Sequence, residues 1–276
     1  MKNAENVMTF IFVLFCMLMI SACGEKTSST ITLNPDFGNE ADVSGAKLTM
    51  TNNSGKKSHI YKQTANGADV LFNKIVPGIY TLTVEHNDYF AFSVDNITVN
   101  NTVSGFTANL TRKGPAGGYV FYDKGNSDSG WRFLEVAPAS AEFNAQWGAD
   151  GTNVSGTQTD IGTGNANTQI INTKLQELGE TGCASQLCIA LNIGGKNDWF
   201  LPSMDELNLM YQNLHKNGLG DFGKGSNSES WMNLYYWSSS QGDGYKYSAW
   251  FQSFGSGLQN DYNKDSTPRV RAVRAF

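Results

Sequence analysis

Charged residues are scarce in this chain. Of its 276 residues, 20 are basic and 25 are acidic, so 16 % are charged and the net charge is −5. Helical bundles need many surface Glu, Lys and Ala residues, and therefore this composition favours a loop-rich β or α+β protein. The mildly acidic balance also argues against nucleic-acid binding, which requires a basic surface.

Histidine is nearly absent as well. The chain has three histidines, and His215 is the one that follows residue 112. A His-based catalytic triad or a metal site with several histidines is therefore unavailable in that half of the chain. Calcium-dependent lectins use a Glu-Pro-Asn or Gln-Pro-Asp triplet, which the sequence lacks. We expect no catalysis and no cofactor, apart from a structural calcium ion for which the acidic loops 123–128 and 260–265 offer oxygen ligands. Solvated loops have the same composition.

Long apolar runs are rare too, and the exception lies at the N-terminus. Lys2 precedes an apolar run over residues 7–20. As a helix this run is about 21 Å long, too short for a bilayer core of roughly 30 Å, so we interpret residues 1–22 as a signal peptide. Ser21-Ala22-Cys23 resembles the bacterial lipobox, which implies cleavage before Cys23 and acylation of this cysteine. The alternative is an ordinary secretory signal with an incidental cysteine.

The lipobox predicts a lipid-anchored protein of the bacterial cell envelope. Gly24, rather than Asp, follows the cysteine, which favours the outer membrane or the cell surface. Residues 23–30 are small and polar and are predicted to form a flexible tether.

Cys183 and Cys188 remain as candidates for a disulfide in an oxidising compartment. In a regular helix, five steps of 100° separate their side chains by about 140°, so a bridge requires one cysteine outside the helix. The sequence is compatible with a disulfide between Cys183 and Cys188 and with two free thiols.

Residues 31–112 read as a β-sandwich. Apolar residues alternate with Thr or Lys along short runs that are separated by turn signals such as Asn66-Gly67 and Pro77-Gly78. The predicted strands are residues 46–51, 70–72, 79–84, 90–94, 97–99 and 106–110. The segments 44–46 (SGA), 64–67 (TANG) and 72–80 (FNKIVPGIY) resemble the carboxypeptidase-regulatory or transthyretin-like family, which implies a seven-stranded spacer without catalysis.

A glycine-rich joint at residues 111–118 marks the boundary with the second domain, which we place at residues 113–276. This domain holds all six tryptophans. Apolar spacing predicts a helix over residues 165–178. A second helix begins at a capping box, Ser203 with Glu206, and ends near Gly218. The predicted strands are residues 119–122, 131–136, 235–240, 247–254 and 269–276.

The second domain carries a series of ordered motifs. They are 117–122 (GGYVFY), 130–132 (GWR), 162–168 (GTGNANT), 198–207 (DWFLPSMDEL), 236–240 (YWSSS) and 270–276 (VRAVRAF). These motifs resemble the Lcl C-terminal domain family. The resemblance implies a C-type-lectin-like α+β fold, related in shape to the formylglycine-generating enzymes. For the adhesin after which the family is named, it implies binding to sulfated glycosaminoglycans. From Lys113 onward, however, 12 basic and 16 acidic residues give a net charge of −4, so we do not carry over the sulfated ligand.

Five residues are the candidates for ligand contact. Trp237 and Ser239 combine a ring that stacks on a sugar with a hydroxyl that hydrogen-bonds it, and Trp250 supplies a second ring. Arg269 and Arg271 lie on one face of the last predicted strand, where two guanidinium groups could bind an anionic glycan. The competing interpretations are a buried Trp on a central strand and internal salt bridges. We therefore predict an envelope lipoprotein whose adhesin-like head binds a glycan, or a host or envelope protein; the alternatives are a structural lipoprotein and, more remotely, an enzyme.

Overall fold

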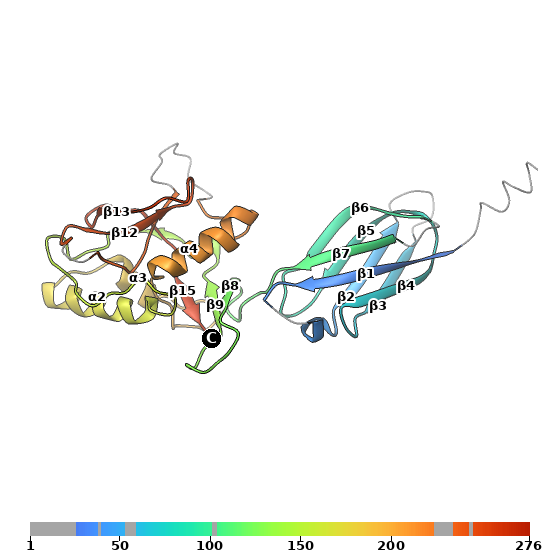
Figure 1. The fold of residues 1–276 in the computed structure, drawn as a ribbon, viewed down its shortest axis with the longest axis horizontal. Helices are drawn as coiled ribbons and strands as arrows, with labels where there is room; N and C mark the ends of the chain where they lie inside the picture. The colour runs from blue at the N-terminus through green and yellow to red at the C-terminus, as the bar shows by residue number, and fades with distance from the viewer. Residues whose placement is uncertain (1–25, 38–39, 53–58, 101–103, 224–233, 243–244) are drawn as a thin grey trace, which may run out of the picture. The chain divides into compact units, whose positions relative to one another are not determined.

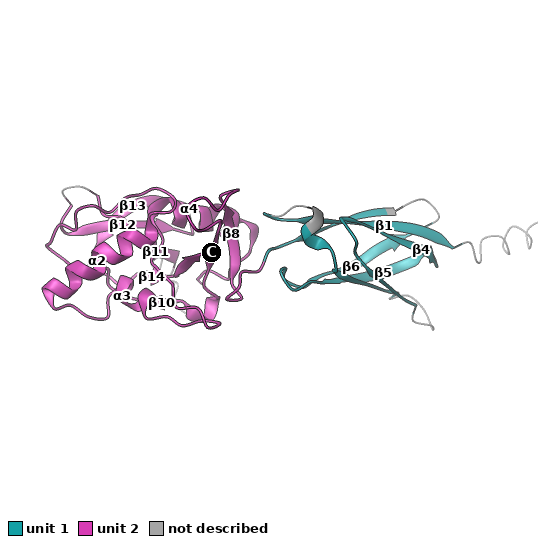
Figure 2. Ribbon diagram, turned by 90° about the horizontal axis from the view of Figure 1, so that it is seen from below, with its two compact units in different colours: residues 1–112 teal, residues 113–276 magenta. Residues whose placement is uncertain are grey.

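The computed structural model describes residues 26–37, 40–52, 59–100, 104–223, 234–242 and 245–276. Its contacts divide the chain into two compact units, residues 1–112 (unit 1) and residues 113–276 (unit 2), as Figure 2 shows. The predicted signal peptide and Cys23 lie outside the described residues. Within the described ranges, no helix has the length and apolar character needed to cross a membrane.

Unit 1 is a sandwich of two sheets with the strand orders β3-β2-β5-β6 and β4-β1-β7 (Figure 1). All neighbouring strands are antiparallel except β1 and β7, which are parallel. The elements are β1 (Thr27–Pro35), the 3-10 helix η1 (Glu40–Val43), β2 (Lys47–Asn52), β3 (Ile60–Thr64), β4 (Asp69–Ile75), β5 (Gly78–Glu85), β6 (Phe92–Val99) and β7 (Ser104–Leu110).

The core of unit 1 follows from the alternation in the sequence. Leu48 and Met50 on β2 and Leu82 and Val84 on β5 are buried, whereas the threonines between them face outward and are only partly buried. A strand turns successive side chains to opposite faces, so this pattern gives one apolar face for each sheet. The predicted sandwich is confirmed.

Three strands of unit 1 differ from the sequence prediction, and one of them, β6, joins the predicted strands 90–94 and 97–99 into Phe92–Val99. β1 begins at Thr27, so the last four residues of the predicted tether, 27–30, are part of the sheet. Ser29 is fully buried and pairs with Phe72 of β4 on one side and Ser104 of β7 on the other. A polar segment can thus join a sheet when neighbouring strands on both sides pair with its backbone. β3 was not predicted, because its five residues carry no apolar alternation.

Unit 2 is an α+β domain. Its sheets have the orders β10-β14-β11-β12-β13 and β15-β9-β8. The elements are β8 (Tyr119–Asp123), β9 (Phe133–Val136), η2 (Ala139–Ala141), β10 (Phe143–Asn144), α2 (Gly164–Leu178), α3 (Ala184–Ile189), α4 (Met204–Asn213), η3 (His215–Asn217), β11 (Tyr235–Trp237), β12 (Ser248–Ser253), β13 (Gln259–Asn263), β14 (Arg269–Val270) and β15 (Val273–Ala275). A β-sandwich followed by an α+β domain is the predicted fold class.

The helix that begins at Ser203 forms as its capping box predicts. Ser203 Oγ accepts from Glu206 N at 3.3 Å, and Glu206 Oε2 accepts from Ser203 N at 2.7 Å. The helix α4 ends after Asn213, and η3 continues to Asn217 before Gly218 adopts a left-handed conformation. The last predicted strand, residues 269–276, is divided: β14 and β15 belong to different sheets, and the chain changes sheet between them.

Candidate ligand-binding surface

Trp237 and Ser239 lie inside unit 2. Trp237 has no exposed surface, and its indole Nε1 donates to the carbonyl oxygen of Ala145 at 3.1 Å. Ser239 is also fully buried, and its Oγ accepts from Asn167 Nδ2 at 3.1 Å. A sugar cannot reach either side chain in this structure. The prediction that they contact a ligand is therefore wrong. The alternative, a buried Trp on a central strand, describes Trp237, and Ser239 is buried with it.

Arg269 and Arg271 are used internally. Glu142 pairs with Arg269, and its Oε2 accepts from Arg271 NH2 at 2.6 Å and from Tyr236 Oη at 2.8 Å. Arg271 also donates to the carbonyl oxygens of Ala137 and Gly220, both at 3.1 Å. Both guanidinium groups bind the Glu142 carboxylate in place of water, and that of Arg271 also binds two carbonyl oxygens. Their predicted contact with an anionic glycan is wrong here, and the salt-bridge alternative is what forms.

A third arginine organises the beginning of unit 2. Arg274 forms a bidentate pair with Asp198, at 2.7 and 2.8 Å, and its NH1 lies 3.3 Å from Glu135 Oε2. Glu135 is fully buried and accepts from the backbone N–H groups of Ala116, at 3.1 Å, and Gly118, at 2.7 Å. Desolvation raises the pKa of Glu135, while Arg274 holds the pKa of Asp198 below its ordinary value. The glycine-rich segment 114–118 is thus wrapped around a buried carboxylate.

Cys183 and Cys188 are free thiols in the structure. Cys183 is the N-cap of α3, and its Sγ lies 3.7 Å from Glu180 Oε2; Cys188 is fully buried in the same helix. Burial raises the pKa of Cys183 to about 11. Of the two states that the sequence left open, the structure therefore has the unbridged one.

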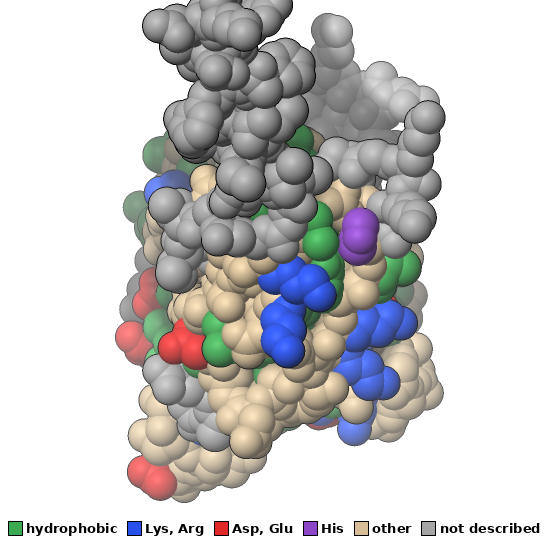
Figure 3. Space-filling model, turned by 90° about the vertical axis from the view of Figure 1, so that its right-hand side faces the viewer, with side chains coloured by type: hydrophobic (Ala, Val, Ile, Leu, Met, Phe, Trp, Pro, Cys, Tyr) green, Lys and Arg blue, Asp and Glu red, His purple; other side chains and the backbone are tan. Residues whose placement is uncertain are grey.

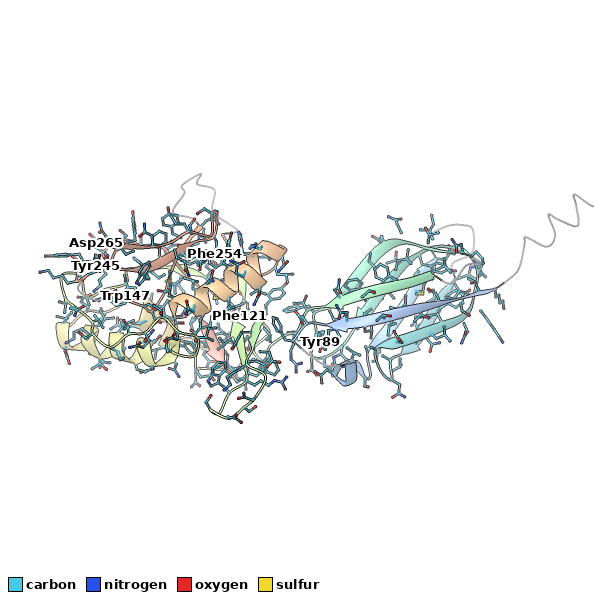
Figure 4. All side chains as sticks on the ribbon, viewed as in Figure 1. Tyr89, Phe121, Trp147, Tyr245, Phe254 and Asp265 are labelled. Carbon is cyan, nitrogen blue, oxygen red and sulfur yellow. The ribbon has the colours of Figure 1, made fainter. Side chains whose placement is uncertain are left out.

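Three aromatic side chains at the start of β12 and just before it are at least partly exposed. Tyr245 and Tyr247 are 61 % and 56 % exposed, and Trp250 is half-buried. A Cβ placed on Gly242 would lie 3.1 Å from Tyr245 Cδ2 and 3.5 Å from Trp250 Nε1, so these two side chains flank Gly242. We call Tyr245, Tyr247 and Trp250 the aromatic surface; Figure 4 shows Tyr245 and Asp265 on the same side of unit 2.

A buried ammonium group supports this surface. Lys264 is fully buried, and its Nζ donates to the carbonyl oxygen of Thr152 at 2.8 Å, to that of Ala149 at 3.3 Å and to Gln241 Oε1 at 2.5 Å. The ammonium also lies 4.7 Å from the centre of the Trp147 ring. Desolvation lowers the pKa of Lys264 to about 8. Lys264 thereby joins the loop around residues 149–152 to the segment that leads to Gly242.

Tyr247 rests on the loop that Lys264 holds. A Cβ on Gly151 would lie 3.4 Å from Tyr247 Cε1, and the carbonyl oxygen of Tyr247 accepts from Lys264 N at 3.0 Å. Lys246 Nζ lies 4.9 Å from the centre of the Tyr247 ring. The position of this ring is therefore set by rigid backbone contacts, although the ring itself is open to solvent.

The two acidic loops proposed for calcium have other partners. Asp123 is bound in a bidentate manner by Arg132, with both distances 2.7 Å, and the loop 260–265 contributes β13 and the buried Lys264. The described residues contain no group of three or more His, Cys, Asp or Glu side chains that could hold a metal ion. Structural calcium stays an untested prediction.

Sequence reasoning missed Tyr245, Tyr247 and Lys264. The tyrosines follow the glycine-rich segment 242–244, and surface loops of this composition are where exposed aromatics are expected. That signal could have identified them. Lys264, in contrast, resembles any other lysine of an acidic loop, because nothing local in the sequence shows that it is buried.

Comparison with known families identifies the second unit. Residues 144–274 match the family model of the Lcl C-terminal domain. Unit 2 therefore contains an Lcl C-terminal domain, and the family predicted from the sequence motifs is confirmed for this part of the chain. No curated protein matches the chain.

Several solved structures share limited similarity with the chain. A type II cohesin–X-dockerin complex from Acetivibrio cellulolyticus is 19 % identical over 32 % of this chain and 58 % of its own, with a TM-score of 0.24. A putative carbohydrate binding protein from Bacteroides uniformis is 13 % identical over 44 % of this chain and 51 % of its own, with a TM-score of 0.27. A DUF4876 family protein from Bacteroides thetaiotaomicron is 16 % identical over 50 % of this chain and 41 % of its own, with a TM-score of 0.24. The chain thus spans about half the length of the solved chains it matches.

Proposed function

We propose that this protein is a lipid-anchored, non-catalytic protein of the bacterial cell envelope whose unit 2 binds a glycan through the aromatic surface. One observation carries the proposal. Tyr245 and Tyr247 keep more than half of their surface exposed on backbone that Lys264 fixes, while Trp237 is fully buried. An exposed ring with a polar tip stacks on the C–H face of a sugar and hydrogen-bonds its hydroxyls.

A non-catalytic role is supported by the surroundings of the one histidine in unit 2. His215 is packed among the rings of Tyr211, Phe222 and Phe254, with centroid distances of 5.8, 6.0 and 5.3 Å. Burial lowers the pKa of His215, and aromatic packing accounts for its position.

The test of glycan binding is an array of neutral, sialylated and sulfated glycans probed with residues 24–276, with and without EDTA. We expect binding that Tyr245→Ala/Tyr247→Ala weakens by at least roughly tenfold, because central aromatic residues carry most of the energy of such contacts. The matched control is Ile161→Ala/Leu258→Ala, since Leu258 is as exposed as Tyr247, at 56 %. Equal loss in both variants, or no glycan bound by the folded protein, would refute the glycan proposal and direct the search to protein partners.

The lipid anchor is tested by Cys23→Ser in cells. Lipidation attaches acyl chains to this cysteine, so the substitution should move the protein from the membrane fraction to the soluble fraction and abolish labelling with a palmitate analogue. Cys183→Ser is the control, because this thiol is buried and should leave both readouts unchanged. Unchanged labelling in Cys23→Ser would contradict the anchor.

A further inference from the structure

One end of the sandwich in unit 1 lies next to the proposed anchor. β1 begins there at Thr27, four residues after Cys23, and Thr27 pairs with Ile75 at the end of β4. The two sheets meet at the same end, because Val76 N donates to Tyr61 Oη at 3.0 Å. The strand registers therefore place the starts of β1, β3, β5 and β7 and the ends of β2, β4 and β6 together. We call this the anchor end.

Most described acidic side chains of unit 1 lie at the end opposite the anchor, together with the basic Lys47 and Arg112. Lys26 and Lys74 are exposed at the anchor end, whereas Lys62, in the middle of β3, lines a surface hollow with Lys47 and Glu85. Figure 3 faces the anchor end and shows Lys and Arg side chains near its centre and right, with Asp and Glu side chains along the left. Asp95, on β6, accepts from Thr81 Oγ1 at 2.6 Å. The other acidic side chains of unit 1 whose surroundings are described belong to the opposite end, where β1 and β5 finish and β4 starts: Asp36, Asp42, Asp69, Glu85 and Asp88.

Apolar side chains are exposed at the anchor end together with the lysines. Ile60, the first residue of β3, is 57 % exposed, and Ile79, the second residue of β5, is 41 % exposed. Basic and apolar side chains on one surface are the combination that binds the boundary between headgroups and acyl chains.

We propose that the anchor end is a docking surface for anionic phospholipid headgroups; this inference rests on the proposed acylation of Cys23. Four residue steps from Cys23 to Thr27 span at most about 14 Å, so an acylated Cys23 keeps β1 close to the bilayer surface. At that distance Lys26 and Lys74 reach the headgroups, and Ile60 and Ile79 contact the boundary beneath them. The acidic residues at the other end of unit 1 oppose docking in the inverted orientation.

The experiment uses residues 23–276, which include every described residue and both hydrophobic cores. The Cys23 thiol is coupled to a maleimide lipid, a selective reaction because Cys183 and Cys188 are buried. The vesicles contain either phosphatidylcholine alone or equal parts of phosphatidylcholine and phosphatidylglycerol. Acetylation of each lysine is then followed by mass spectrometry.

On the anionic vesicles we expect Lys26 and Lys74 to react roughly fivefold more slowly than on phosphatidylcholine. The internal control is Lys47, at the opposite end of unit 1, which is exposed and should react equally on the two vesicles. The protection should vanish at about 1 M salt, where the screening length is about 3 Å. Equal rates for Lys26 and Lys74 on both vesicles, or equal protection of Lys47, would overturn the proposal.

A pair of charge-reversal variants gives a second measurement. Lys26→Glu should remove the protection of Lys74, whereas Lys47→Glu, with the same change in net charge, should retain it. Because the lipid is attached chemically, this result does not depend on acylation in the cell. If Lys26 and Lys74 are protected from acetylation on anionic vesicles but Cys23 is not acylated in cells, the proposed anchor is refuted. The docking surface is not refuted by that result.

Discussion

At the scale of single residues, unit 2 buries two ionisable side chains among neutral hydrogen-bond partners. Glu206 accepts from Gly162 N at 2.8 Å and from Ser203 N at 2.7 Å, and Lys264 donates to two carbonyl oxygens and an amide oxygen. Such bonds offset part of the cost of removing a charge from water. The rest of that cost is seen in the pKa values, which burial raises to about 7 for Glu206 and lowers to about 8 for Lys264.

Glu206 should make the stability of unit 2 depend on pH. Its folded-state pKa of about 7 lies above the ordinary value of 4.5, so the folded state binds the proton more tightly than the unfolded state. The contribution of Glu206 is therefore fully present below about pH 4.5 and is lost as the pH rises through about 7, by up to about 3 kcal/mol. Urea unfolding at a series of pH values measures this change in the free energy of unfolding.

The control is Glu206→Gln, which cannot ionise. Because both carboxylate oxygens accept N–H groups, an amide places its own donor against one of them and should cost about 1–3 kcal/mol. This variant should also lose the dependence on pH between about 5 and 7. The same dependence in both proteins would assign it to another group and contradict the role of Glu206.

At the scale of elements, the joint between the units ends in ordered structure. Gly118 N donates to Glu135, and β8 begins at the next residue. A Cβ on Gly118 would overlap the carbonyl oxygen of Val136, so only glycine allows β8 and β9 to approach each other here. The glycine content of residues 111–118 thus reflects close packing as well as a turn.

Gly118→Ala should therefore destabilise unit 2 by about 2 kcal/mol or more, because backbone atoms must move to admit the methyl group. The matched control is Gly105→Ala on β7, where a Cβ would have no neighbour within 4 Å and the change should stay within about 1 kcal/mol. Chemical denaturation of the full chain and both variants measures the difference. An undisturbed Gly118→Ala protein would show that the contact with Val136 relaxes freely.

Elements with a strong local signal were predictable from the sequence. The alternating apolar residues of β2 and β5 and the capping box of α4 fix both the type and the position of these elements. β3 and α3 were not predictable, since the first has no apolar alternation and the second has only six residues. The division of the last strand into β14 and β15 depends on pairing with segments more than 100 residues away, which no local pattern encodes.

The candidate site was less predictable than the fold. A Trp beside three serines has the same sequence whether its ring is buried or exposed, and Trp237 proved to be buried by long-range contacts. Arg269 and Arg271 likewise depend on Glu142, more than 120 residues earlier in the chain. Trp250 is the predicted residue that remains at the surface, and its neighbours Tyr245 and Tyr247 had to come from the structure.

At the scale of the whole molecule, each unit has its own hydrophobic core. The buried apolar cluster of unit 1 is drawn from residues 31–110. Unit 2 has two such clusters, one drawn from residues 137–272 and the other from residues 121–273. Both units are within the size range of autonomous domains, about 50–250 residues.

Residues 26–112 and residues 113–276 should therefore each fold when produced separately, because each core is complete within one unit. Each should show a cooperative thermal transition and a near-ultraviolet circular dichroism spectrum of ordered aromatic residues. The summed spectra of the two units should reproduce that of residues 26–276. A unit that lacks a cooperative transition would show that it needs the other to fold.

The ammonium group of Lys264 has a consequence for how the aromatic surface responds to its surroundings. A metal ion in this position would be lost whenever the medium became poor in that metal, and the loop would then lose its support. Lys264 is part of the chain and cannot diffuse away, so its contacts with Thr152 and Gln241 persist in the presence of a chelator. The support that Lys264 gives to the loop beneath Tyr247 therefore does not depend on a diffusible ion.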